Sequence, residues 1–553
     1  MTAGDPRRDA RLFGVLGCAL LALIVVSIRL APTERERMIP RHLENTVFEP
    51  PPASPGTGAA WSTLWADFMA RPGTQFLDAM LPTQSGVLLI SLIVALMVAF
   101  NYARPFTLRN LELLALLVIG FLLFNVMRFF DLLADPTYFH VMDAVFIGIM
   151  ATSLGLIGLA IWRVRHEPMT AWRPNLPAGA LVTLTVLLFS LNVLIAVIKP
   201  PDDAGFYTNL GAQRLRERGR FPYGDPLLSN SAGAGYGPIL YLAHLPFQLL
   251  LNPEPLNQTA PTRTDLGAGA EYYLPPPLAS QLTTVSFHLL GLVSLVFIGR
   301  RLAGSDVAWG IAALYCGSAY VMGVGGPRET IGGMTFISHI APAAVSLLAF
   351  SALTRPFAAG ALLVASAATV FYPVLFFPAW LGHYWDRRPS AWRFVAGCAF
   401  AALLIGGPVL ALSQPIEGHG VLGTVVRESV GHHQGTDTYG QSTFGFWGQR
   451  GGIRARFSQP LVTGEFTTTP MFLMTMGFAA GMFFLARKTT PQQLALITAS
   501  LAIVAQLSKV HGTGVYVNWY YPFLLIGFLA NGPRAVVAQA TTPTGDARPV
   551  QRE

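Results

Sequence analysis

Residues 178–198, AGALVTLTVLLFSLNVLIAVI, form a strongly apolar stretch, and residues 201–224, PDDAGFYTNLGAQRLRERGRFPYG, follow it almost at once. An α-helix needs about 20 apolar residues to cross a bilayer. The first stretch therefore predicts a membrane-spanning helix. Because Asp202 and Asp203 stand just beyond its last residue, the sequence places two adjacent carboxylates at the mouth of that helix.

The composition of the whole chain indicates the same class of protein. Of its 553 residues, 52% are hydrophobic and 12% are charged, and the mean hydropathy is +0.48. A soluble globule of this length does not have such a composition, so we expect an all-α, polytopic membrane protein. Apolar runs that predict single spans occur at residues 12–30, 86–103, 110–130, 138–162, 178–198, 282–299, 307–323, 336–353, 392–412, 470–486, 491–509 and 516–532.

One further apolar run, residues 357–384, is too long for an ordinary span. Proline cannot continue a helix without losing a backbone hydrogen bond, and Tyr372-Pro373 and Phe377-Pro378 interrupt this run. We therefore expect a tight hairpin of two short helices here. With it, the sequence predicts about 14 transmembrane helices.

The distribution of Lys and Arg predicts the orientation of these helices, because both residues concentrate in cytoplasmic loops. With the N-terminus inside, the predicted inner loops hold Arg104, Arg109, Arg163, Arg165, Arg173, Arg300, Arg301, Arg355, Arg387, Arg388, Arg487 and Lys488. The pattern works only if residues 238–251, which include a proline, lie at the outer surface or re-enter without crossing. The net charge of +8 then reflects membrane orientation, and nucleic acid is not an expected partner. We expect a multi-pass protein of the bacterial inner (plasma) membrane.

Three parts are predicted along the chain. Residues 1–177 form an N-terminal membrane module of four spans, residues 178–532 form the main module, and residues 533–553 form a disordered cytoplasmic tail. Cys18, Cys316 and Cys398 all fall in predicted spans, so no disulfide framework is implied.

The predicted extracytoplasmic loops are residues 31–85, 199–281 and 413–469, and chemistry is expected there. The first carries an apolar stripe at helical spacing, which predicts an interfacial helix on the membrane or against the protein: Trp61, Leu64, Trp65, Phe68 and Met69.

In the second loop the two aspartates precede a predicted helix from about Ala204 to Arg218, which Gly219 ends. An aspartate directly before a helix is a good N-cap, and Asp203 is expected to fill that role. Capping would account for the carboxylate of Asp203, but it gives no role to the carboxylate of Asp202. Along the helix we expect an apolar face of Phe206, Tyr207 and Leu210 and a basic edge of Arg214, Arg216, Arg218 and Arg220.

Five pieces of the sequence resemble the GT-C superfamily, in particular its bacterial mannosyl- and arabinosyltransferase-like members. They are Asp202-Asp203-Ala-Gly-Phe-Tyr with residues 218–226, then Gly235-Tyr-Gly-Pro-Ile-Leu-Tyr-Leu (235–242), residues 368–380, residues 441–448 and Trp519-Tyr-Tyr-Pro (519–522). The resemblance covers residues 178–532 and leaves the four N-terminal spans unassigned. It implies a GT-C-like fold and an enzyme that transfers a sugar from a polyprenyl-phosphate donor.

The resemblance also implies roles for the carboxylates. The acidic motif of these enzymes supplies a general base, so Asp202 is the first candidate and Asp203 the second. Inversion at the anomeric carbon is implied as well. The acceptor is expected to be an extracytoplasmic glycan, lipid or protein of the cell envelope. Metal dependence stays open, with Mg²⁺ or Mn²⁺ as the candidate ions.

A lipid-linked phosphate needs guanidinium or ammonium groups at the membrane surface. Arg328 and Lys509, in short predicted outer loops, are the first candidates, and Arg214 is the next. Aromatic rings suit the faces of sugars. The acceptor-binding candidates are Tyr207, Tyr236, Tyr439 and Trp447.

Two other functions are compatible with parts of the sequence. A ligase or polymerase of lipid-linked polysaccharide would rely on Arg427, His432 and His433 of the third outer loop and would not need Asp202. A secondary transporter would show inverted repeats and ionisable residues near the membrane centre. The ionisable residues here collect at span ends, and no internal repeat is visible, so a transporter is the weaker alternative.

Overall fold

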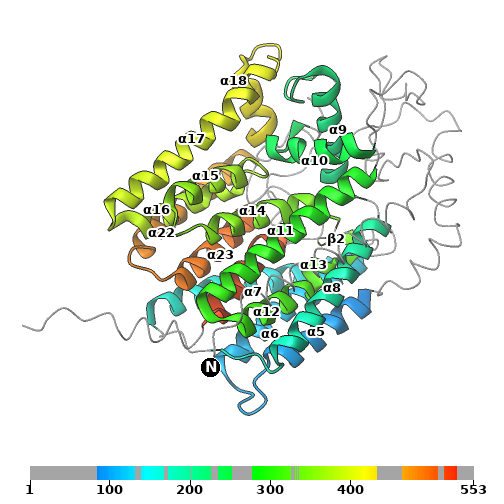
Figure 1. The fold of residues 1–553 in the computed structure, drawn as a ribbon, viewed down its shortest axis with the longest axis vertical. Coiled ribbons are helices and arrows are strands. Elements are labelled where there is room, and N and C mark those ends of the chain that lie inside the picture. The colour runs from blue at the N-terminus through cyan, green and yellow to red at the C-terminus, as the bar shows by residue number, and fades with distance from the viewer. Residues whose placement is uncertain are drawn as a thin grey trace, which may run out of the picture.

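The computed structural model is built almost wholly of α-helices (Figure 1). It describes residues 84–130, 139–166, 172–199, 201–225, 234–251, 277–325, 330–331, 333, 335–431, 464–508 and 516–531. The predicted span at 12–30 and the predicted interfacial helix at 61–69 lie outside these residues. In the described part, four helices are long and apolar enough to cross a membrane: Gly148–Arg165, Ala178–Ile198, Leu278–Ala303 and Arg388–Leu412.

The helices follow the predicted apolar runs closely. Those before residue 319 are α5 Gln84–Ala99, α6 Leu108–Phe130, α7 Phe139–His166, α8 Ala178–Ile198, α9 Asp203–Arg218, α10 Pro238–Leu251, α11 Pro277–Ala303 and α12 Ser305–Cys316. Those after it are α13 Ala319–Met322, α14 Ile337–Ser351, α15 Pro356–Ala367, η3 Tyr372–Phe376, α16 Phe377–Trp385, α17 Arg388–Leu412, α18 Val421–Val426, η4 Arg427–Gly431, α22 Gly464–Leu485, α23 Pro491–Ser508, η5 Tyr516–Trp519 and α24 Tyr521–Leu529. Two short strands, β1 Val324–Gly325 and β2 Thr330–Ile331, pair antiparallel.

The expected hairpin at 357–384 is present as two short helices, α15 and α16, joined through the 3-10 turn η3. Two other predicted spans are also broken. The run 307–323 is divided at Gly317 into α12 and α13, and the run 516–532 begins as the 3-10 turn η5 before Pro522 opens α24. Hydropathy alone does not reveal such breaks, because the residues on both sides of each break are equally apolar.

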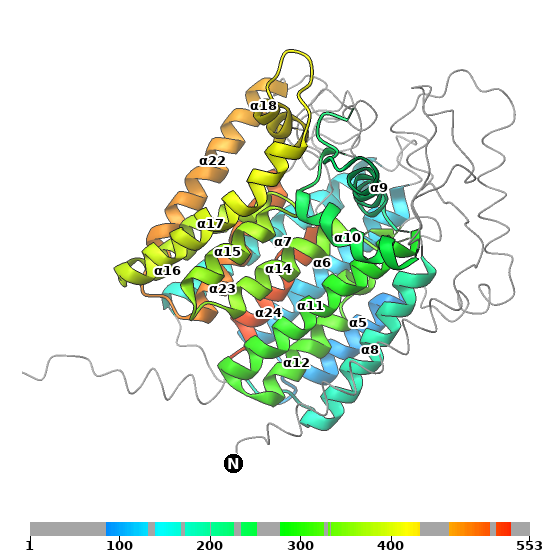
Figure 2. The ribbon, with the colours of Figure 1, turned by 45° about the horizontal axis from the view of Figure 1, so that its top comes forward.

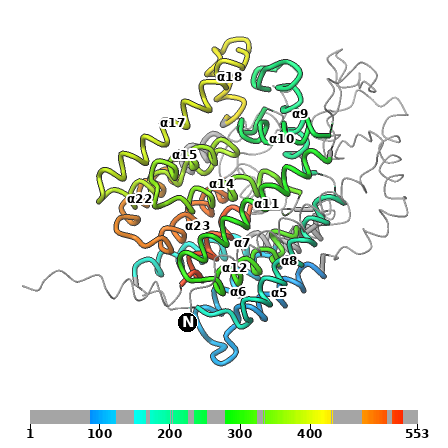
Figure 3. Tube along the Cα trace, in the orientation of Figure 1, coloured from blue at the N-terminus to red at the C-terminus, as the bar shows by residue number. Residues whose placement is uncertain are grey.

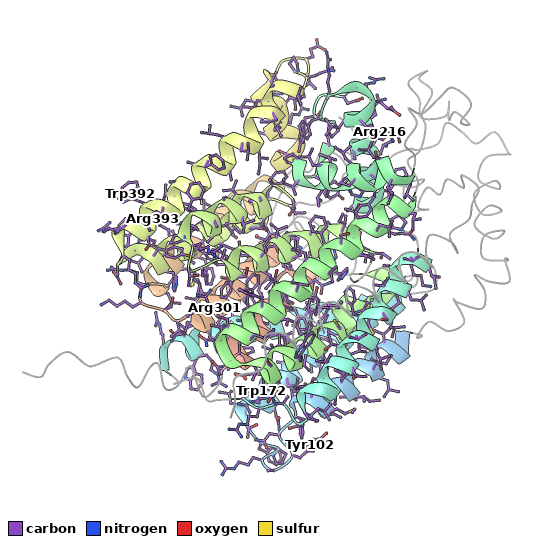
Figure 4. The ribbon with its side chains drawn as sticks, viewed as in Figure 1. Tyr102, Trp172, Arg216, Arg301, Trp392 and Arg393 are labelled. Carbon is purple, nitrogen blue, oxygen red and sulfur yellow. The ribbon has the colours of Figure 1, made fainter. Side chains whose placement is uncertain are left out.

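Helix ends that the charge pattern places on the inner side contact one another, and we call this side of the molecule the arginine-rich end. Arg301 donates to Thr354 Oγ1 at 3.1 Å, and Arg487 pairs with Asp386 at 2.7 Å. The backbone N–H of Trp172 donates to the carbonyl of Asn531 at 2.6 Å. Figure 4 shows Tyr102, Trp172, Arg301 and Arg393 along one edge and Arg216 on the opposite edge.

The helix ends predicted on the outer side also contact one another, and we call this side the Asp202 end. Gln281 donates to the carbonyl of Lys199 at 2.7 Å, and Asn518 donates to the carbonyl of Tyr320 at 2.7 Å. The backbone N–H of Gly237 donates to the carbonyl of Thr369 at 2.9 Å. The structure thus groups the helix ends into two sets. Their orientation in a membrane stays a prediction.

The helices on either side of residue 178 share one core. Gly120 of α6 donates its N–H to the Tyr320 hydroxyl at 3.1 Å, and Ala319 donates its N–H to the hydroxyl of Ser91 on α5 at 3.3 Å. Figure 2 shows α5, α8 and α12 grouped together, and α5 and α8 each contact α12. The predicted boundary at 177/178 therefore does not separate two hydrophobic cores.

Helices α15 and α17 cross at glycines. A Cβ atom on Gly360 would lie 2.2 Å from the Phe394 carbonyl oxygen, and one on Gly397 would lie 2.0 Å from the Phe357 carbonyl oxygen. The Cys398 thiol lies 3.4 Å from the carbonyl of Gly360. Only glycine at both positions permits this close backbone approach.

We expect Gly397→Leu to destabilise the protein by at least the roughly 1–3 kcal/mol that overpacking costs, because the new side chain meets backbone rather than a movable side chain. Thermal unfolding of the detergent-solubilised protein measures the effect. Gly406→Leu, on the same helix, is the matched control, since a Cβ there meets nothing within 4 Å. Equal melting temperatures for the two variants would contradict the crossing.

Candidate functional site

Asp202 is the N-cap of α9, at the end of the bundle opposite the arginine-rich end. Its backbone is extended, and its Oδ1 accepts the N–H of Gly205 at 2.8 Å. Its own N–H donates to the carbonyl of Thr335 at 3.4 Å, and the residue is buried, with 5% of its surface exposed. The sequence predicted Asp203 as the cap. That assignment is wrong because the helix begins one residue earlier than expected, so the capping position falls on Asp202.

Gly205 and Ser280 fix the space around this carboxylate. A Cβ atom on Gly205 would lie 2.6 Å from Ser280 Oγ and 2.9 Å from Asp202 Oδ1. The two oxygens therefore both approach the Cα of Gly205, and any larger residue at 205 would displace one of them. Within the described residues, the buried Ser280 hydroxyl has no hydrogen-bond partner. Ser280 could not be recognised from the sequence, because an isolated serine at the start of an apolar helix carries no signal.

Arg214 does not lie on the basic edge of α9. Its Nε and Nη2 donate to the two carboxylate oxygens of Asp225 at 2.9 and 3.4 Å, and both side chains are buried. Arg216 is half-buried, and Arg218 and Arg220 are exposed, as the predicted basic edge requires. The ion pair ties the last turns of α9 to the segment that follows it, a structural role that competes with the predicted phosphate binding by Arg214.

That following segment docks on residues 412–428. Phe221 donates its N–H to the carbonyl of Leu412 at 3.0 Å, and Gln414 donates its N–H to the carbonyl of Tyr223 at 3.1 Å. Gly224 has φ of 77°, and a Cβ there would lie 2.1 Å from the Gln414 carbonyl oxygen. Figure 3 shows α9 and α18 at the same end of the molecule, although they lie far apart in sequence. The second and third predicted outer loops thus meet.

Tyr207 and Tyr236, two of the predicted acceptor-binding residues, are both buried. Tyr207 packs edge-on against Phe206, with ring centroids 5.6 Å apart. The Tyr223 hydroxyl donates to the carbonyl of Tyr236 at 2.6 Å, and the Tyr236 N–H donates to the Tyr241 hydroxyl at 3.3 Å. In this conformation neither ring presents a face to a sugar, and both serve packing.

An aromatic ladder joins three segments next to Asp202. Tyr372 stacks on Trp519 at 3.9 Å between ring centroids, Trp519 stacks on Tyr516 at 4.2 Å, and the Tyr516 ring lies 4.5 Å from His339. His339 in turn lies 4.8 Å from Phe336, the residue after Thr335. The ladder brings the predicted hairpin and the last predicted span to the acidic segment. His339 had no signal in the sequence beyond its place in an apolar run.

Several predicted site residues fall outside the described part of the structure: Arg328, Lys509, Tyr439, Trp447, His432 and His433, together with the side chain of Asp203. Their assigned roles stay predictions. Across the residues that the structure does describe, no three His, Cys, Asp or Glu side chains gather in a way that could hold a metal ion.

Comparison of the chain with protein-family models, with curated proteins and with solved structures found no match. A functional interpretation therefore depends on the geometry and chemistry of the site.

Glu428 closes the contact between the two predicted loops. Its Oε2 accepts the N–H of Gly224 at 2.7 Å, while its Oε1 is buried without a hydrogen-bond partner among the described residues. Burial raises the pKa of the Glu428 carboxyl above its ordinary value, and the charge of Asp225 raises it further. The Gly224 N–H and the Arg427 guanidinium oppose this rise. The docked contact therefore favours the protonated carboxyl.

Because the pKa of Glu428 is higher in the folded protein than in the unfolded chain, its protonated carboxyl contributes to stability in full below the unfolded pKa of about 4.3. This contribution is lost as the pH rises through the folded-state pKa. We expect Glu428→Gln, which keeps an acceptor for Gly224 and carries no charge, to weaken this pH dependence. Thermal unfolding across pH 4 to 9 measures it.

The control is Glu428→Ala, which leaves the Gly224 N–H unsatisfied at every pH and should cost about 1–3 kcal/mol. Identical pH profiles for the wild type and Glu428→Gln would show that Glu428 does not titrate in the docked contact.

Proposed function

We propose that the protein is a GT-C-like membrane glycosyltransferase that moves a sugar from a polyprenyl-phosphate donor to an extracytoplasmic glycan, lipid or protein acceptor. The observation that carries the proposal is the placement of Asp202: a buried carboxylate on a helix N-terminus, at the end of the bundle opposite the arginine-rich end.

The meeting of the resembling segments supports the proposal. The Tyr223 hydroxyl joins the first segment to the second by donating to the Tyr236 carbonyl at 2.6 Å, and Gly237 and Ile239 donate to the carbonyls of Thr369 and Ala368. Tyr372 then stacks on Trp519. Four of the five segments that carry the resemblance thus lie in one connected region, although they span more than 300 positions of the chain. The fifth, residues 441–448, is outside the described part.

The proposed reaction is a displacement at the anomeric carbon. A hydroxyl oxygen of the acceptor forms a bond to that carbon while the bond to the donor phosphate oxygen breaks, and the polyprenyl phosphate leaves with the electron pair. The hydroxyl proton passes to the Asp202 carboxylate, with Asp203 as the alternative base. The positive end of the α9 dipole stabilises a negative carboxylate at this position. A single displacement inverts the anomeric centre.

The proposed reaction also requires cations that hold the donor phosphate. We retain Arg328 and Lys509 for this role. Arg214 ranks below them because it is committed to Asp225.

We also propose an orientation: about 14 spans in a bacterial inner membrane, with the Asp202 end extracytoplasmic and the arginine-rich end in the cytoplasm. In a variant without the native cysteines, we expect Arg218→Cys to react with an impermeant thiol reagent on intact spheroplasts. Arg393→Cys, exposed at the other end, should react only after permeabilisation. The reverse pattern would invert the topology and remove the donor from the side of the base.

The catalytic role of Asp202 has a direct test, because asparagine caps a helix about as well as aspartate. Asp202→Asn should therefore fold and insert normally, and it should lose transfer by roughly 10² to 10⁴ in rate, the usual contribution of a positioned base. Turnover with a synthetic polyprenyl-phosphate sugar measures the loss. Asp202→Ala, which also removes the cap, should in addition lose about 1 kcal/mol of stability.

Asp203→Asn is the matched control and should affect transfer far less. A larger loss in Asp203→Asn than in Asp202→Asn would move the base to Asp203 and leave the reaction class intact. Near-normal turnover by the double Asn variant, with confirmed expression and donor binding, would sink the proposal and favour a ligase or polymerase that acts through the third predicted outer loop.

A further inference from the structure

Three charged side chains gather between α6 and α7 at the arginine-rich end, and we call them the Arg109 cluster: Arg109, Glu112 and Arg163. Arg163 Nε donates to Glu112 Oε1 at 2.7 Å, and both residues are buried, with 7% and 2% of their surfaces exposed. Arg109 lies one turn before Glu112 on α6 and is half-buried. The charges of Glu112 and Arg163 both act on its guanidinium group. The acidic segment around Asp202 is at the other end of the molecule.

The cluster holds two guanidinium groups and one carboxylate. Arg163 forms an ion pair with Glu112 at 2.7 Å. Arg109 makes no ion pair within 4 Å in the part of the chain that the structure describes. Removing a charge from water without a counter-charge costs several kcal/mol. The excess positive charge of the cluster, partly withdrawn from solvent, is therefore the kind of site that an anion stabilises.

A small apolar cavity lies beside the cluster. Arg109 and Glu112 line a cavity of about 10 Å³, and its other walls are apolar, with Ala99 of α5, Leu116 of α6 and Phe528 of α24 among them. This volume holds about one water-sized group. The surface exposed in this cavity is wholly apolar, so it suits a hydrocarbon group and not an anion. An anion would instead reach Arg109 through the part of its half-buried side chain that is exposed. A free phosphate ion would gain nothing from these walls.

The surroundings of the cluster are those of a membrane interface. Tyr102 and Trp162 are exposed by 64% and 42% on the same end, and Arg104 and Arg165 are exposed beside them. Aromatic side chains anchor helices at the level of the lipid headgroups, and basic pockets between transmembrane helices bind anionic headgroups. Figure 4 shows Tyr102 on the same edge of the molecule as Arg301 and Arg393.

We propose that the Arg109 cluster binds the phosphodiester headgroup of an anionic phospholipid from the leaflet at the arginine-rich end. This site is independent of the proposed glycosyl transfer. It gives a ligand to the N-terminal helices, to which the resemblance assigns no role. Arg109 supplies the main contact, Arg163 adds positive charge from α7, and Glu112 limits the affinity by competing for both.

Lipid binding can be measured on the purified protein, delipidated in a neutral detergent, by native mass spectrometry and by lipid-dependent thermal shift. The probes are phosphatidylglycerol, phosphatidylcholine and inorganic phosphate. We expect phosphatidylglycerol to bind and to raise the melting temperature, and the other two to do neither at equal concentration. Arg109→Gln should weaken phosphatidylglycerol binding about tenfold or more, the usual effect of losing a charge-assisted hydrogen bond.

Two further variants test the sign of the effect. Glu112→Gln removes the competing carboxylate and should tighten phosphatidylglycerol binding. Arg104→Gln, an exposed arginine near Arg109 in the chain but outside the cluster, is the matched control and should bind like the wild type.

Equal effects of Arg109→Gln and Arg104→Gln would overturn the site, as would equal wild-type binding of phosphatidylglycerol and phosphatidylcholine. An effect of inorganic phosphate as large as that of phosphatidylglycerol would overturn the assignment to a lipid. The wild-type titrations decide these last points even if a variant fails to fold.

Discussion

Backbone carbonyls at broken helix ends need hydrogen-bond donors in an apolar surrounding, and this requirement organises the structure. The last carbonyls of α12 are supplied from distant helices: Asn192 of α8 donates to Cys316 at 2.9 Å, and the Tyr521 hydroxyl donates to Leu314 at 3.0 Å. Gln281 of α11 donates to the carbonyl of Val197, in the last turn of α8, and to that of Lys199, just beyond the helix. Each break in a helix is thus also a cross-link between helices.

The same requirement explains why irregular backbone gathers at the Asp202 end. Trp519 of η5 donates to the carbonyl of Ser338 at 3.2 Å, and the first N–H groups of the α10 segment reach the carbonyls of Ala368 and Thr369. Aromatic and amide side chains stack or donate hydrogen bonds at these breaks. They thereby fix the ends of several helices relative to one another. A site made of such ends combines residues from remote parts of the sequence without a large loop of its own.

The sequence predicts most of the fold because hydropathy is a local property. The run 178–198 matches α8 to the residue, and the prolines at 373 and 378 predict the hairpin.

The candidate site was less predictable because its roles depend on long-range partners. Nothing near Arg214 reveals that Asp225 folds back to meet it, and nothing near Gly224 reveals Glu428. The sequence predicts that Tyr207 and Tyr236 bind a sugar acceptor, but both rings are buried by the packing around α9 and α10. The residue that caps α9 was misassigned by one position, which is the usual uncertainty of a helix boundary.

The cap at Asp202 has a consequence for the order of events in any reaction at this site. One carboxylate oxygen is fixed by the Gly205 N–H as soon as α9 forms, so the rotamer of the side chain is chosen during folding. An aspartate that had to be oriented by its substrate would lose that conformational freedom on each encounter, at the expense of affinity. Here the orientation is pre-organised, and the binding free energy of a substrate remains available for bringing its own reacting atoms into line.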